Sequence, residues 1–209
     1  MKPLALSKRG RTMTTVLAAA LVLWAGAPLS AQDAQEIPEV DLPVLLTSCG
    51  QSPGPTRVRF FLSRLDMEHD FLPQATVADL NEGVGGAPFE SLIIVTGASL
   101  KGMGAAGVSM QEELARTRDL IATARERDIP VVCAHVEGMA RRAQGAAAGD
   151  NSDEQSIDAV CPNADLMLVR ADGNEDRRFS IISENEGIPL ILFEKNMEMG
   201  DVLQQIFGS

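Results

Sequence analysis

The chain has 209 residues with 18 basic and 29 acidic side chains, for a formal net charge of −11 at neutral pH. This length suits one domain with a substantial core, and so negative a charge argues against nucleic acid and anionic membranes as partners. The cysteines are Cys49, Cys133 and Cys161, and their spacing matches no zinc motif. No metal site and no cofactor are therefore predicted.

The first 31 residues have the three parts of a secretory signal. Four basic residues come first, and an apolar run of 14 residues follows from Val16 to Leu29. This run is shorter than the roughly 20 residues that a membrane-spanning helix needs. Small residues at its end predict cleavage after Ala31, which would leave 178 residues with a net charge of −15 and no tryptophan. We therefore expect an exported protein, in the periplasm or outside the cell.

An odd number of cysteines in an oxidising compartment leaves at least one thiol that is free or paired between chains. The sequence does not decide which cysteines pair. Oligomeric state is equally open.

After a polar, flexible leader at residues 32–41, one domain is predicted over residues 42–209. Short apolar runs predict buried strands near residues 43–46, 70–72, 92–95, 129–132, 166–169 and 188–192. Apolar periodicity and capping boxes predict a short helix that starts at Thr76 and helices near residues 58–65, 109–128, 152–161, 174–186 and 199–207. The glycine-rich stretch from Gly97 to Gly107 is expected to be a loop.

Strands that alternate with helices predict an α/β fold with a parallel sheet covered on both faces. Right-handed crossovers then make it a three-layer doubly wound domain, flavodoxin-like or Rossmann-like. We expect five or six strands, with the order 2-1-3-4-5.

Ligands of such sheets bind at the carboxyl ends of the strands, where the winding changes direction. The loops after the first, third and fourth strands are rich in glycine and polar residues. Glycines and helix starts offer backbone N–H groups, and three basic side chains add positive charge, so an anionic small molecule is the expected ligand. The candidate binding residues are Ser48, Cys49, Gly50, Gln51, Ser52, Gly97, Ser99, Lys101, Gly102, Gly104, His135, Arg141 and Arg142.

Three motifs carry a resemblance to a known family: TSCGQSPG at residues 47–54, GASLKGMGAAG at residues 97–107, and G-x-x-R-R at residues 138–142 followed by Ser152-Asp153. Together they resemble a family of exported bacterial proteins classed as a domain of unknown function. The resemblance covers about residues 42–207. It implies an exported α/β fold and supplies no activity, substrate or catalytic residue.

An enzyme of acyl or phosphoryl transfer or hydrolysis is the alternative. Residues 50–54 spell the G-x-S-x-G nucleophile motif around Ser52, with His135 as the one plausible base. Cys49 is the second candidate nucleophile, because a helix start beside it would lower its pKa. A protein-docking module is a third class, which would expose a broad apolar surface.

A nicotinamide enzyme is not expected. Gly102, Gly104 and Gly107 spell G-x-G-x-x-G, but they lie several residues beyond a strand and after the third strand rather than the first. The chain also has no tyrosine, which the resembling short-chain dehydrogenases need. His69, His135, Glu137 and Cys49 are not expected to form a metal site.

Overall fold

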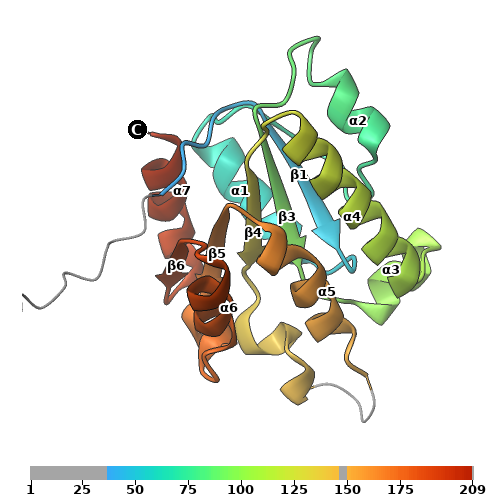
Figure 1. Cartoon of the computed structure of the whole chain (residues 1–209), viewed down its shortest axis with the longest axis vertical. Helices are drawn as coiled ribbons and strands as arrows, with labels where there is room; N and C mark the ends of the chain where they lie inside the picture. Colours follow the sequence, from blue (N-terminus) through green and yellow to red (C-terminus); the bar gives the residue numbers. More distant parts are fainter. Residues whose placement is uncertain (1–36, 146–149, 209) are drawn as a thin grey trace, which may run out of the picture. The chain divides into compact units, whose positions relative to one another are not determined.

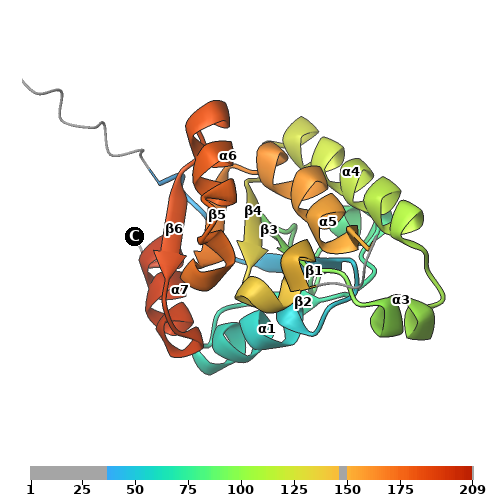
Figure 2. The same ribbon diagram turned by 90° about the horizontal axis from the view of Figure 1, so that it is seen from below.

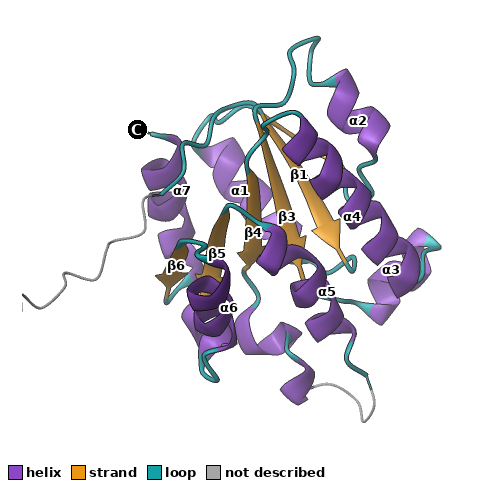
Figure 3. Ribbon diagram, in the orientation of Figure 1, coloured by secondary structure: helices purple, strands orange, loops and turns teal. Residues whose placement is uncertain are grey.

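Six parallel strands form one sheet in the computed structural model, which describes residues 37–145 and 150–208 (Figure 3). The strands are β1 (Val44–Cys49), β2 (His69–Phe71), β3 (Ser91–Thr96), β4 (Val131–His135), β5 (Leu166–Arg170) and β6 (Leu190–Phe193). Their order is β2-β1-β3-β4-β5-β6. The predicted doubly wound order is confirmed, and β6 extends it at the edge. The predicted signal peptide lies outside the described residues.

Helices cover both faces of the sheet. They are α1 (Gly54–Arg64), α2 (Val77–Glu82), α3 (Leu100–Ala106), α4 (Met110–Glu126), α5 (Ser152–Val160), α6 (Arg178–Glu186) and α7 (Met199–Phe207). Short 3-10 turns are η1 (Gly138–Arg141), η2 (Ala143–Gly145), η3 (Cys161–Asn163), η4 (Ala171–Asn174) and η5 (Asn196–Glu198). Figure 2 shows α1 and α7 on one face and α4, α5 and α6 on the other.

Two cores result, one on each face of the sheet. Val44 and Leu46 of β1 pack with the side chains of α1 and α7, whereas Leu45 and Cys49 pack towards α4. Every residue of β1 is buried. Burial on both faces explains why the strands are continuous apolar runs rather than alternating ones.

The fold begins earlier than predicted. Val40 is buried, and the carbonyl of Asp41 accepts a hydrogen bond from Ser91 Oγ at 2.7 Å. Ile37 packs against the core that α1 and α7 share. The prediction of a flexible leader is therefore wrong for residues 37–41, because the apolar side chains of Ile37 and Val40 pack against the core.

The glycine-rich stretch after β3 is not wholly a loop, because it contains α3. Ser99 caps this helix by accepting a hydrogen bond from the amide of Gly102 at 3.0 Å, and Gly107 ends it in the left-handed conformation. The helix predicted from residue 174 starts at Arg178 instead, since Arg177 adopts a φ of 61°. Within the described residues, no helix is long and apolar enough to cross a membrane.

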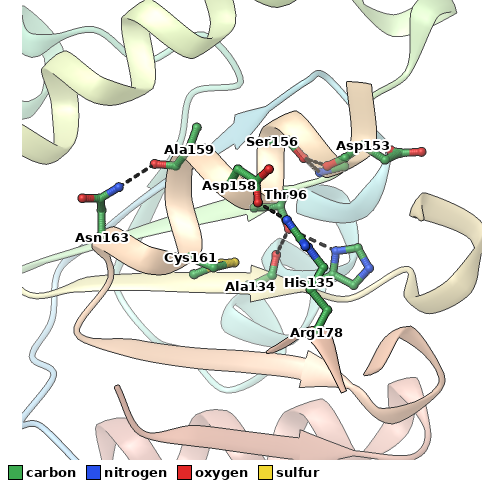
Figure 4. Close-up of a disulfide and its surroundings, with 12 residues drawn as sticks. Thr96, Ala134, His135, Asp153, Ser156, Asp158, Ala159, Cys161, Asn163 and Arg178 are labelled. Atoms are coloured by element: carbon green, nitrogen blue, oxygen red, sulfur yellow. Dashed lines mark hydrogen bonds and ion pairs between the residues drawn. A yellow bond between two sulfur atoms is a disulfide. The ribbon is translucent and has the colours of Figure 1, made fainter. Parts of the chain in front are cut away.

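A disulfide joins Cys133 of β4 to Cys161, directly after α5 (Figure 4). Both residues are buried, and their Cα atoms lie 5.3 Å apart. Cys49 is the remaining free thiol and is buried as well. The disulfide ties the α5–β5 connection to the centre of the sheet.

Candidate functional site

The loops after β1 and β3 are packed directly against each other. The amide of Ser99 donates to the carbonyl of Gly50 at 2.7 Å, and Gln51 pairs with Ala98 in an isolated bridge. Gly50 has a φ of 103°, and a β-carbon there would lie 2.7 Å from the Cα of Ala98. Glycine is therefore required at residue 50 by the contact between the loops, independently of any ligand.

The loop after β4 joins the same group. Arg141 donates from Nη1 to the carbonyl of Ala98 at 2.8 Å. A β-carbon on Gly97 would lie 3.1 Å from both Arg141 Cγ and Ser52 Oγ. Glu137 accepts a hydrogen bond from the amide of Gly54, at the start of α1, over 3.1 Å. The three predicted loops thus meet between β1 and β3, where the winding changes direction (Figure 1).

We call this group the switch-point cluster and define it as Ser52, Gly97, Glu137, Arg141 and Asp153. The prediction that backbone amides there are free for an anion is wrong, because the chain's own side chains accept from them. Gly50 donates to Glu113 at 2.9 Å, Gly54 to Glu137 at 3.1 Å, Gly97 to Ser156 at 3.0 Å and Ala98 to Asp153 at 2.6 Å. Three of these four amides therefore donate to carboxylates of the protein itself, and the fourth donates to a hydroxyl.

The three carboxylates were not among the predicted site residues. Glu113, Glu137 and Asp153 are 1%, 4% and 9% exposed, so each is a buried acid. Burial raises the pKa of Asp153 above its usual value, partly offset by the hydrogen bond from Ala98. A signal for Glu113 does exist in the sequence: it lies on the same helical stripe as Thr117, Leu120 and Ala124, which is the inward face of α4.

The predicted group of three positive side chains does not form. Arg142 is 2% exposed and points away from the cluster. Its guanidinium forms ion pairs with Glu154 at 2.8 Å and with Asp176 at 2.7 Å. It also lines a separate hollow of about 420 Å³ beside α6. Lys101 is exposed on α3, and no described residue forms an ion pair with it. Only Arg141 remains in the cluster, because it is the last residue of η1, whereas Arg142 follows the turn in extended backbone.

Arg141 has unused hydrogen-bonding capacity. Its Nε lies 3.6 Å from Glu137 Oε2, an ion pair too long for a hydrogen bond. This Nε is buried and has no hydrogen-bond acceptor among the described residues. A buried donor without an acceptor is costly, so its presence calls for an explanation.

Cys49 is not an activated thiol. Its side chain points to the α4 face, opposite the face that α1 covers, and its Sγ lies 3.6 Å from Thr117 Oγ1. Burial raises the pKa of Cys49 to about 11, and nearby Glu113 adds to the effect. The predicted low pKa is wrong because the alternation of side chains along β1 turns this residue away from the helix start.

His135 is also a core residue. Its Nδ1 lies 3.1 Å from Thr96 Oγ1 (Figure 4). Its ring is buried against the ring of Phe179 at a centroid distance of 4.9 Å, and its Nε2 lies 3.1 Å from the Gly138 carbonyl. Burial lowers its pKa to about 4. Ser52 is 8% exposed, and its Oγ accepts from the amide of Gly54 at 3.2 Å. No described contact pairs it with His135.

The other predicted residues make contacts that hold the loops in their conformation. Ser48 Oγ accepts from the amide of Gln51, and the side chain of Gln51 donates to Glu113 at 3.0 Å. A β-carbon on Gly102 would collide with the carbonyl of Gln51, whereas Gly104 faces open space. Among the described residues, no group of three or more His, Cys, Asp or Glu side chains is placed to hold a metal ion.

The fold and the cluster define a doubly wound α/β domain with a buried polar group at its switch point. Residues 41–207 match the family described as Domain of unknown function (DUF6305), and the chain belongs to this family. The predicted membership of a family of unknown function is thereby confirmed. No curated protein matches the chain.

Solved structures show distant likenesses. A GDP-L-fucose synthetase from Naegleria fowleri bound to NADP is 9% identical with a TM-score of 0.36, covering 78% of this chain and 52% of that one. The chain thus spans about half the length of the synthetase. The SGNH-hydrolase family esterase AlinE4 is 12% identical with a TM-score of 0.31, covering 73% of this chain and 75% of the esterase. Neither likeness bears on function.

Proposed function

We propose that this domain binds a small anionic molecule at the switch-point cluster, with Arg141 as the residue that holds the anionic group. The observation that carries the proposal is the buried Nε of Arg141, which has no hydrogen-bond acceptor among the described residues. Its Nη1 is already used on Ala98. The Nε side of a guanidinium can donate two parallel hydrogen bonds to a carboxylate or phosphate.

The neighbours of Arg141 narrow the class of ligand. Glu137 and Asp153 are acceptors when ionised, and Ser52 Oγ offers a hydroxyl beside Gly97. A bare anion would be repelled by these two carboxylates. A small acid that also carries hydroxyl or amino donors would satisfy Arg141 and the carboxylates together, so we propose hydroxy acids or amino acids as the ligand class.

Enzymatic acyl or phosphoryl chemistry has less support. Cys49 is buried with a raised pKa, and His135 is committed to Thr96 and Gly138 within the core. Ser52 has no hydrogen bond to a general base among the described residues. No specific observation therefore favours Cys49 or Ser52 as a nucleophile.

Replacing Arg141 with glutamine is expected to weaken binding of the best ligand by about tenfold or more, since a charge-assisted hydrogen bond contributes about 1.5–3 kcal/mol. The measurement is a thermal-shift screen of lactate, gluconate, amino acids, acetate and inorganic phosphate, followed by titration calorimetry. Arg118→Gln removes an equal charge from the exposed face of α4 and is the matched control. Equal affinity of both variants and the wild type would show that Arg141 does not line the site.

We also infer that the protein is exported and cleaved after Ala31. The signal-like N-terminus supports this inference, and so does the Cys133–Cys161 disulfide, because structural disulfides are rare in reducing compartments. The expected result is an intact mass, measured on protein from the periplasm or medium, that corresponds to residues 32–209. A mass that includes residues 1–31 would contradict cleavage.

A further inference from the structure

The outer side of α1 carries positive charge and apolar surface together. We call Arg57, Arg59, Phe60, Arg64 and Met197 the α1 surface. Helix α1 contains three arginines and no acidic residue, in a chain whose formal net charge is −11. It lies on the face of the sheet opposite α4, α5 and α6 (Figure 2).

The arginines of the α1 surface have no acidic partners within the part of the chain that the structure describes. The eight ion pairs among the described residues all involve other arginines, which are Arg116, Arg141, Arg142, Arg170, Arg177 and Arg178. Arg59 instead lies over the ring of Phe71 at 5.7 Å. A protein with an excess of carboxylates thus leaves three arginines of one short helix without an ion pair among the described residues.

Apolar side chains stand among these cations. Phe60 is 56% exposed and Met197 is 66% exposed. The ring of Phe60 meets the buried ring of Phe61 edge to face at 5.1 Å, which holds it in place. Two hollows of about 320 and 460 Å³ flank Phe60. One is lined by Thr56, Arg57, Phe60, Phe61, Asn196 and Met197, and the other by Thr56, Arg59, Phe60, Ser63 and Arg64.

This combination identifies the kind of occupant. Exposed aromatic and arginine side chains are the residues that concentrate binding energy in protein interfaces. Unpaired arginines favour carboxylates on the partner, and hollows of this size each accept a side chain. A second copy packed symmetrically would place arginine against arginine. An anionic bilayer would leave the hollows unfilled and would repel the rest of the acidic chain.

We propose that the α1 surface docks an acidic peptide segment of a partner protein, one apolar side chain of which fills a hollow beside Phe60. Carboxylates that flank this apolar residue pair with Arg57, Arg59 and Arg64. The surface lies along the outer side of α1, whereas the switch-point cluster meets only the first residue of that helix. The docking function is therefore separate from ligand binding by Arg141.

The test is selection from a random dodecapeptide library displayed on phage, with the exported form of the protein immobilised. The expected result is enrichment of peptides in which Asp or Glu flanks Phe, Leu or Met. Affinities of the synthesised peptides are then measured for Phe60→Ser and Arg64→Glu. The matched controls are Ile181→Ser and Arg118→Glu, which make the same changes at exposed positions on the opposite face.

Each α1 variant is expected to weaken peptide binding by about tenfold or more, and each control by less than about twofold. All four positions are exposed, so thermal melting should confirm that the variants remain folded. Enriched peptides without excess acid, or peptides that bind the α1 variants as well as the wild type, would overturn the proposal. Phe60-dependent dimerisation without peptide, or Phe60-dependent binding to phosphatidylglycerol vesicles, would assign the surface to another occupant and equally overturn it.

Discussion

Replacing Cys133 and Cys161 together with alanine should lower the free energy of unfolding by about 3–4 kcal/mol. The disulfide closes a loop with a sequence separation of 28 residues, and its removal gives the unfolded chain more conformational freedom. Both sulfur atoms also lie in the core, so the loss of their packing adds to the effect. The measurement is urea unfolding followed by circular dichroism.

Reductant provides the internal comparison for this result. Wild-type protein should lose a similar free energy of unfolding when the disulfide is reduced, whereas the double variant should not respond. Cys49→Ala also removes a buried sulfur but no covalent link, so its stability should still fall on reduction. If the double variant unfolds at the same urea concentration as the oxidised wild type, the disulfide contributes nothing to stability.

Acidification should destabilise the protein through His135. Burial lowers its pKa in the folded state from 6.5 to about 4. Above about pH 6.5 neither the folded nor the unfolded state binds a proton at this residue, so stability is unaffected. As pH falls towards about 4, the unfolded state gains a proton that the folded state cannot accept. The loss should approach about 3 kcal/mol, because one pKa unit corresponds to about 1.36 kcal/mol.

The measurement is the free energy of unfolding at a series of pH values between 7 and 4 for three proteins. Wild type and His69→Gln should lose stability together, since His69 is only partly buried in β2. His135→Gln is expected to be less stable at neutral pH, but its free energy of unfolding should change less between pH 7 and 4. A parallel pH profile for His135→Gln and the wild type would show that His135 does not govern the acid response.

Loop geometry explains why the loops after β1, β3 and β4 meet as predicted. Parallel strands end at one edge, so a correct strand order places the loops that hold Ser52, Gly97 and Arg141 together. Their meeting is therefore predictable from the alternation of apolar and amphipathic segments. The direction of each side chain is not predictable in this way, because it depends on the alternation within a strand and on turns of a few residues.

The sequence alone determined the class of fold, the strand order and the three loops at the sheet's carboxyl edge. These follow from local patterns, since strand burial and helix periodicity are written in neighbouring residues. Only the tertiary structure decided that Cys133 pairs with Cys161, that Glu113 and Asp153 accept from the loop amides, and that α1 is left with unpaired arginines. Each of these depends on residues far apart in the chain, and a local pattern carries no information about which distant groups will meet.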